Sequence, residues 1–154
     1  MELRHTIAAR LHLLHRWNCP WASDAPPSRA YLGEYGELAA ASYLRAHGLK
    51  VLYRNFRYGS SGEIDIMCRE GDTLVACEVK STASSAGGAP MRMVDYAKRE
   101  LLRRGMRNWL YLLGRDDIPT RFDIVEVFLN GDQKPSIRHH RNAFGMHEGR
   151  RHRS

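Results

Sequence analysis

The sequence predicts one α/β domain in which helices flank a mixed β-sheet. Two observations predict it. Segments with apolar residues at helical spacing alternate with segments rich in β-branched and aromatic residues, and their order is helix, three strands, helix, strand. A sheet covered by helices is the layered arrangement that this order favours. The length of 154 residues and the hydrophobic content of 43% suit a single core.

The first helix is predicted over residues 31–47. Leu38, Ala41 and Leu44 recur at helical spacing, and alanines fill the positions between them. Gly48 stands where a helix commonly ends, because glycine readily adopts the left-handed conformation that terminates a helix.

Three strands are predicted next, rich in strand-forming residues and separated by glycine-containing turns. They cover residues 50–58, 63–69 and 73–81. The turn around Glu70-Gly71-Asp72 is short, so the second and third strands are expected to pair as a hairpin.

A long helix is predicted over residues 93–113, after a small-residue loop at residues 82–90 that could close over a ligand. Gly105 is expected to break or kink this helix. One helix face is strongly basic, and its residues are candidate contacts to nucleic-acid phosphates: Arg92, Lys98, Arg99, Arg103, Arg104 and Arg107. A solvated helix face without a partner is the competing interpretation.

A last strand is predicted over residues 121–129, and the chain then divides into three segments. Residues 1–30 form an N-terminal extension in which prolines interrupt a short helical pattern. Residues 31–130 form the α/β domain. Residues 131–154 are polar and basic and are expected to be a disordered tail, in which the pair His139-His140 belongs to no recognisable ligand set.

Charge and cysteine content narrow the class of protein. The formal charge of +7 attracts polyanions, of which nucleic acid is the commonest. Cys19, Cys68 and Cys77 are an odd number without paired spacing, so neither a disulfide framework nor a zinc site is indicated, and a cytoplasmic location is expected. Charged residues interrupt the first fourteen positions, so neither a signal peptide nor a membrane interaction is expected.

The predicted hairpin carries the candidate chemistry. Alternation along a strand sets Glu63 and Asp65 on one face with Ile64 and Ile66 on the other. If the turn centres on residues 70–71, residue 65 lies across from residue 76 and residue 63 across from residue 78.

The third strand adds two more charged side chains, because Glu78 and Lys80 also share one face. In the register just given, Asp65 and Glu78 are diagonal neighbours, close enough for both carboxylates to bind one ion. A divalent cation with oxygen ligands would offset the repulsion between acids on so small a patch, and Mg²⁺ is the natural candidate. The competing interpretation is a solvated hairpin face on which Lys80 forms a plain surface ion pair.

A further carboxylate is expected from the first helix. Glu37 lies at helical spacing with Ala40, Ala41 and Leu44, on the face that should meet the sheet, where a charge is costly without a partner. It could therefore join the same site. Glu34, one turn earlier, is the competing candidate.

These residues belong to an ordered series of motifs. Gly36-Glu37 opens an alanine-rich helix that ends at Gly48, and the series continues with Arg54-Asn55-Phe56-Arg57, Gly62-Glu63-Ile64-Asp65-Ile66, Glu78-Val79-Lys80 and Arg121-Phe122-Asp123-Ile124-Val125-Glu126. From about residue 33 to residue 127 it resembles the YraN-like family of uncharacterised bacterial proteins. Members of that family are predicted to belong to the PD-(D/E)XK nuclease superfamily and are similar to archaeal Holliday-junction resolvases. The resemblance implies a restriction-endonuclease-like fold, a three-layer α/β core with a mixed sheet flanked by helices.

The resemblance also implies roles for individual residues. Asp65 and Glu78 hold the metal, Glu37 completes its shell from the helix, and Lys80 positions or activates the attacking water. Glu63 supports the edge of the site, paired with Arg54 or Arg57. Ser81-Thr82 departs from the family, which more often has a basic residue after the lysine, and this puts phosphate contacts at that position in doubt.

The predicted function is therefore a metal-dependent endonuclease that hydrolyses phosphodiester bonds in DNA, on branched or single-stranded forms, with Mg²⁺ or Mn²⁺ as cofactor. DNA is favoured over RNA, and the analogy with resolvases suggests a homodimer. The alternative is a catalytically inactive nucleic-acid-binding protein of the same fold. A purely structural interaction module is the third hypothesis, and it predicts no salt-sensitive binding to nucleic acid.

Overall fold

The structure is a computed structural model that describes residues 28–60, 62–83, 94–129 and 134–147. Most of the predicted N-terminal extension, together with Cys19, Arg92 and the end of the predicted tail, lies outside these ranges. Within them, no helix combines the length and the apolar character needed to cross a membrane.

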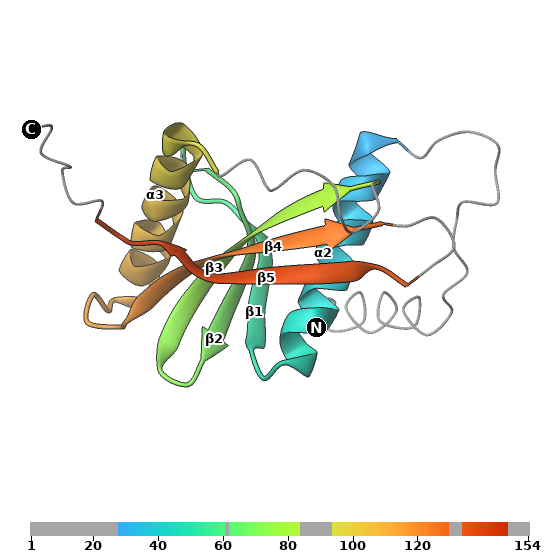
Figure 1. Ribbon diagram of the computed structural model, residues 1–154. Helices are drawn as coiled ribbons and strands as arrows, with labels where there is room; N and C mark the ends of the chain where they lie inside the picture. Colours follow the sequence, from blue (N-terminus) through green and yellow to red (C-terminus); the bar gives the residue numbers. More distant parts are fainter. Residues whose placement is uncertain (1–27, 61, 84–93, 130–133, 148–154) are drawn as a thin grey trace, which may run out of the picture.

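In the described residues, five strands form one mixed sheet in the order β1-β2-β3-β4-β5, with the helices α2 and α3 packed against it (Figure 1). β3 and β4 run parallel, with α3 between them in the chain, and the other neighbouring strands are antiparallel. In chain order the elements are α2 (Arg29–Ala46), β1 (Lys50–Phe56), β2 (Ile64–Glu70), β3 (Thr73–Thr82), α3 (Tyr96–Leu113), β4 (Thr120–Phe128) and β5 (Ser136–Phe144). The predicted α/β fold with a mixed sheet is confirmed.

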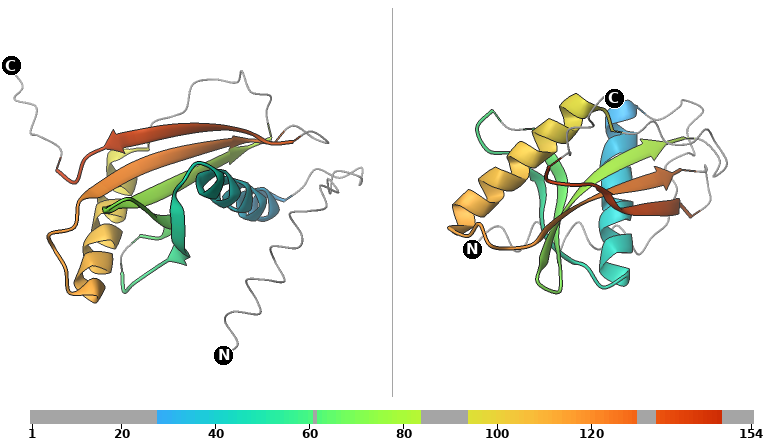
Figure 2. Two further views of the ribbon diagram at one scale, coloured as in Figure 1. Left: turned by 90° about the horizontal axis from the view of Figure 1, so that it is seen from below. Right: turned by 60° about the vertical axis from the view of Figure 1, so that its left-hand side comes forward.

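Two hydrophobic cores lie on opposite faces of the sheet. On one face Ile66 and Val125 pack with the alanines of α2, and on the other Met67 and Ile124 pack with Leu102 of α3. Figure 2 shows α2 and α3 apart from each other along the twisted sheet. β2 and β3 are therefore buried on both sides along most of their length, which corrects the expectation that each strand of the hairpin exposes a charged face.

Local sequence signals fix the ends of the helices. Ser28 caps α2 with its side-chain oxygen, and Gly48, with a φ of 86°, follows the helix end as predicted. Asp95 caps α3, which runs unbroken through Gly105. A Cβ at position 105 would lie 2.9 Å from Ile64 Cδ1, so the glycine allows close packing. The prediction that it interrupts the helix was wrong.

β5 lies within the segment predicted to be a disordered tail, so that prediction was wrong for residues 136–144. The strand has no apolar alternation because its polar side chains face buried acids on β4. His139 Nε2 lies 2.8 Å from Asp123 Oδ2, and His140 Nε2 lies 2.7 Å from Glu126 Oε2. A strand that pairs charges in this way looks like a polar tail in the sequence.

The predicted β2–β3 hairpin is confirmed, but its register differs from the prediction. Ile66 pairs with Cys77, and the turn consists of residues 71–72, whose glycine has a φ of 55°. The predicted turn centre lay one residue too early. Continued by one pair, the observed register sets Asp65 directly opposite Glu78 instead of diagonal to it.

The two cysteines in the described ranges, Cys68 and Cys77, are free thiols buried in the core beneath α2. A hydrogen bond with Cys68, together with burial, raises the pKa of the Cys77 thiol well above its usual range. The Cys77 thiol is therefore poorly reactive in the folded protein.

α2 approaches β3 closely through Gly36, and this contact gives a testable prediction. A Cβ there would lie 1.7 Å from Ser81 Oγ and 2.7 Å from Ser81 Cβ. We expect Gly36→Ala to lower the free energy of unfolding by about 1–3 kcal/mol, because overpacking outweighs the gain in helix propensity. Urea denaturation followed by circular dichroism measures the change.

Gly33→Ala is the matched control, since it lies on the same helix with nothing within 4 Å of an added Cβ. It should leave stability unchanged or raise it by up to about 1 kcal/mol. Equal behaviour of the two variants would contradict the close contact.

Candidate active site

The candidate site lies where β2 and β3 stop pairing. The ladder ends at the pair Ile66–Cys77, and further along β3 the backbone N–H of Val79 donates to Asp65 Oδ2 at 2.7 Å. A side-chain carboxylate thus takes the place of a backbone acceptor. We call this place, where backbone pairing ends and Asp65 bonds to Val79 instead, the opening between β2 and β3.

Asp65 also interrupts the alternation of β2. Ile64 belongs to the core beneath α3 and Ile66 to the core beneath α2, although strict alternation would set both on one face. The β1–β2 register sets Asn55 opposite Asp65, and Asn55 has a φ of 56°. The predicted shared face of Ile64 and Ile66 was wrong, because a left-handed residue on the neighbouring strand accompanies a local twist of the pair.

The carboxyl group of Asp65 is strongly perturbed. Burial, followed by the negative charge of Glu78, raises the pKa of Asp65 to about 7, and Glu37 adds to the effect. The hydrogen bond from Val79 and the charge of Lys98 act in the opposite direction. Asp65 therefore interacts electrostatically with both other carboxylates of the predicted set, one from each side of the sheet.

Glu78 lies between two lysines. Its side chain is 3% exposed, and Lys80 Nζ donates to its Oε1 at 2.8 Å, which confirms that Glu78 and Lys80 share a face. Lys98 Nζ lies 3.0 Å from Oε2 as an ion pair. That contact lacks the alignment of a hydrogen bond, so among the described residues Oε2 is a buried oxygen that accepts none.

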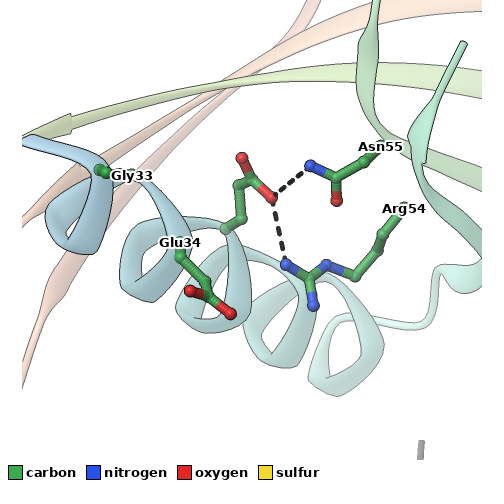
Figure 3. Close-up of a pocket in the computed structure, with 6 residues that line it drawn as sticks. Gly33, Glu34, Arg54 and Asn55 are labelled. Carbon is green, nitrogen blue, oxygen red and sulfur yellow. Dashed lines mark hydrogen bonds and ion pairs between the residues drawn. The ribbon is translucent and has the colours of Figure 1, made fainter. Parts of the chain in front are cut away.

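Glu37 approaches the opening from the side of α2. Its Oε2 accepts hydrogen bonds from Arg54 Nη2 and Asn55 Nδ2, both at 3.1 Å, and Figure 3 shows these two side chains directed at the same carboxylate. Glu37 lines two adjoining pockets of about 510 and 370 Å³, and the second also contains Val79. Glu34 is exposed and lines the first pocket but not the second, so Glu37 is the better placed of the two candidates.

These carboxylates do not form an assembled metal shell. Within the described ranges, no three His, Cys, Asp or Glu side chains are grouped so that they could hold one ion. Glu37 is bonded to Arg54 and Asn55, and Glu78 to its lysines. The donor set nevertheless fits a hard divalent cation, since it offers carboxylate oxygens alone, and one of them, Glu78 Oε2, is buried without a hydrogen bond.

Glu63, which was predicted to support the edge of the site, lies apart from Glu37, Asp65 and Glu78. It forms an ion pair with Arg57 at 2.6 Å on an exposed surface, so Arg57 is its partner and Arg54 is not. Arg54 instead holds Glu37.

The predicted basic face of α3 is only partly a surface. Arg103 is 2% exposed, donates from Nε to Gly145 O at 2.9 Å and forms an ion pair with Glu100. Its guanidinium also lies over the ring of Phe144 at the end of β5. Arg103 is therefore not available as a surface contact, because β5, which was not foreseen, covers this part of the helix.

The other basic residues of α3 differ in their surroundings: one is bonded within the protein, one pairs with Glu78, and two are exposed. Arg99 is partly buried and donates to Val94 O at 2.8 Å. Lys98 belongs to the candidate site through Glu78, a role for which the sequence offered no signal beyond its place near the start of the helix. Arg104 and Arg107 are exposed, as predicted.

A buried acid on β4, Asp123, was not among the predicted residues. It accepts two hydrogen bonds from Arg121, at 2.8 and 2.9 Å, one from the backbone of Asn142, and faces His139. Burial alone would raise the pKa of Asp123, but these hydrogen bonds lower it below the usual range. An acid inside an otherwise apolar strand was the available signal, and its partners place it in a structural network that fixes β5 to β4.

Comparison with known proteins points to one group. The family model described as "Uncharacterised protein family UPF0102" matches residues 36–127. A UPF0102 protein of Streptomyces coelicolor is 42% identical over 117 residues, which cover 75% of this chain and 90% of the relative. A UPF0102 protein of Geobacter metallireducens is 40% identical over 115 residues, which cover 75% of this chain and 93% of the relative. A UPF0102 protein of Symbiobacterium thermophilum is 41% identical over 113 residues, which cover 73% of this chain and 95% of the relative. The matched residues include the whole candidate site.

Proposed function

We propose a function on the premise that this chain belongs to the uncharacterised protein family UPF0102: it is a metal-dependent nuclease of the PD-(D/E)XK kind that hydrolyses phosphodiester bonds in DNA. One observation carries the proposal. Where the backbone pairing of β2 and β3 ends, Asp65 interacts electrostatically with the buried Glu78, and Lys80 is bonded to Glu78. Two carboxylates can hold a divalent cation and a lysine can stabilise charge on a phosphate, and both functions suit phosphodiester hydrolysis.

The chain's own residues supply three parts of the reaction. Asp65, Glu78 and Glu37 would hold Mg²⁺ or Mn²⁺, which when bound polarises the scissile phosphate and lowers the pKa of water. Lys80, whose side chain is 46% exposed, would stabilise the negative charge that develops on the phosphate. The formal charge of +7 favours a nucleic-acid substrate.

A catalytically inactive nucleic-acid-binding protein is the second candidate, and one observation favours it. Every carboxylate of the set is already engaged, Glu37 by Arg54, Glu78 by Lys80 and Lys98, and Asp65 by Val79. A protein that never takes up a cation would keep these internal pairs.

Cleavage assays decide between the two candidates. The chain and its Glu78→Gln variant are incubated with single-stranded, duplex and four-way-junction DNA and with structured RNA, each with Mg²⁺, Mn²⁺ or EDTA. We expect metal-dependent cleavage of DNA by the parent chain, reduced about 100-fold or more in the variant, because glutamine keeps the shape of the side chain but loses its charge.

Asp72→Asn is the matched control, since it removes an exposed acid at the far end of the same hairpin and should cleave like the parent chain. Binding that survives EDTA, without cleavage by any of the three proteins, would identify the inactive binder instead.

A further inference from the structure

Lys98 reaches the candidate site from the side of the sheet that α3 covers. Its Nζ lies 3.0 Å from Glu78 Oε2, and the side chain of Glu78 is only 3% exposed. The other oxygen of Glu78, Oε1, accepts a hydrogen bond from Lys80 at 2.8 Å. The contact of Lys98 with Oε2 is instead an ion pair that lacks hydrogen-bond alignment. The two lysines therefore hold the same carboxylate in different ways, and Lys98 holds it by charge alone.

The charge of Lys98 acts on Asp65 as well. Burial and the charge of Glu78 raise the pKa of Asp65 to about 7, and the charge of Lys98 acts in the opposite direction. An ammonium group has this effect only if it lies near the carboxylate. One positive charge from α3 is therefore shared by the two acids at the opening between β2 and β3.

Close packing fixes the backbone of α3 beside this opening. A Cβ at Gly62 would lie 2.4 Å from Leu101 Cβ, and a Cβ at Gly105 would lie 2.9 Å from Ile64 Cδ1. Both contacts join α3 to the chain that enters β2, so the helix has little room to shift. The long side chain of Lys98 is the part that can move.

A cation is needed at the opening even before a metal arrives. Asp65 and Glu78 repel each other, and a buried carboxylate without a partner is costly. The ammonium group of Lys98 offsets both effects. Mg²⁺ would lie about 2.0–2.1 Å from the same oxygens and would carry a larger charge. That spacing is shorter than the 3.0 Å between Lys98 Nζ and Glu78 Oε2, so the space that the ammonium leaves can hold the ion.

Lys98 also has a way out. Its side chain is 29% exposed, so the ammonium group can turn into water on its flexible four-carbon stem. Lys80 stays hydrogen-bonded to Oε1 when this happens, and Oε2 becomes free. Glu78 thus keeps one partner while its second oxygen becomes available as a ligand.

We propose that Lys98 is a positioning residue that occupies the cation's place in the metal-free protein and withdraws when a divalent cation binds. This inference rests on the proposed nuclease function. Lys98 keeps Asp65 and Glu78 together before the cation arrives, and its charge competes with the cation for Glu78 Oε2. Lys98 therefore sets the concentration of Mg²⁺ or Mn²⁺ that the protein needs.

Calorimetric titration of the metal-free chain with Mn²⁺, without nucleic acid, tests this role. We expect Lys98→Met to bind Mn²⁺ more tightly than the parent chain by about 10- to 100-fold, the range over which groups beside a metal site change its affinity. Lys50→Met is the matched control. It makes the same change at an exposed position near the other end of β2, opposite Arg69, and should bind Mn²⁺ like the parent chain.

Thermal denaturation separates competition from a merely structural role. Without metal, Lys98→Met should be less stable than the parent chain, because the buried Glu78 loses one of its two partners. Mn²⁺ should then raise the melting temperature of the variant more than that of the parent chain. If the methionine variant does not fold, Lys98→Gln is used, since its neutral amide can still donate a hydrogen bond to Glu78. Lower stability without tighter Mn²⁺ binding would mean that Lys98 is only structural, and would overturn the proposal.

The outcomes also separate this inference from the proposed function. Equal or weaker Mn²⁺ binding by the Lys98 variants, with binding to the parent chain lost in Glu78→Gln, overturns the role of Lys98 and leaves the metal site intact. Tighter binding in Lys98→Met that persists when Glu78→Gln is added places the ion elsewhere, and this also overturns the role. No Mn²⁺ binding by the parent chain or the variants overturns both proposals.

Discussion

Asp65→Asn is expected to abolish metal-dependent cleavage, by about 100- to 1000-fold, and at the same time to stabilise the metal-free protein. Asparagine keeps an oxygen that can accept the hydrogen bond from Val79 N–H, so the opening between β2 and β3 should persist. It removes the negative charge that lies buried beside Glu78. The same change therefore removes a proposed metal ligand and relieves repulsion.

The sign of the stability effect follows from the pKa of Asp65. That pKa is raised from 3.8 to about 7, so between these values the unfolded chain is ionised at this position while the folded protein holds a proton. Below about pH 4 the carboxyl of Asp65 is protonated in both states and does not lower the free energy of unfolding. As the pH rises to about 7, the free energy of unfolding falls because ionisation is easier in the unfolded chain. At pH 8 the loss amounts to roughly 2–4 kcal/mol, and Asp65→Asn should recover it.

Urea denaturation at pH 5 and pH 8 in EDTA measures this effect. The gain from Asp65→Asn should be larger at pH 8. Asp65→Ala serves as the comparison, because it relieves the same repulsion but leaves Val79 N–H without its acceptor, and it should be less stable than Asp65→Asn. A destabilised Asp65→Asn at pH 8 would contradict the electrostatic account of the opening.

Asp123→Ala is expected to lower the free energy of unfolding by about 3–5 kcal/mol. The carboxylate of Asp123 is fully buried and is bonded to Arg121, His139 and the backbone of Asn142. Its removal leaves the Arg121 guanidinium, only 15% exposed, without its bidentate partner. The contact that fixes β5 to β4 is lost with it.

Thermal and urea denaturation of Asp123→Ala measure the loss, and hydrogen exchange of β5 locates it. Asp117→Ala is the control, since it removes an aspartate that is also bonded to an arginine, Arg115, but on an exposed surface. It should show no measurable change, because exposed ion pairs contribute little. A similar small effect for Asp123→Ala would mean that the network does not stabilise β5.

Residue periodicity was enough to predict α2, α3 and the strands β1 to β4, but not β5. It placed Glu78 and Lys80 on one face and brought Asp65 near them, because the period of a strand is fixed by its backbone. It could not set the register of the hairpin, since that depends on which residues form the turn. It also missed the break in alternation at Asp65, because the sequence of β2 cannot predict the left-handed conformation of Asn55 on β1.

The remaining errors share one physical origin. β5 was mistaken for a tail because its histidines and arginines are paired with Asp123, Glu126 and Glu70, and such pairing appears only after distant segments meet. Arg103 was assigned to the surface for the same reason, because the segment that covers it follows about forty residues later. Burial of charge depends on tertiary contacts that no local pattern records.

The close packing of α2 against the sheet limits which substitutions this protein can accept. Glutamate has a short side chain, so the backbone that carries Glu37 must stay near the sheet if its carboxylate is to act on groups between β2 and β3. The small residues beneath it, Gly36 and the alanines at 39–41, set that spacing. Enlarging Gly36 would push the helix outward and withdraw the acid, so on the proposed function a substitution that never meets a substrate would still lower cleavage. On that function, volume in this part of the interior is constrained by chemistry as well as by packing.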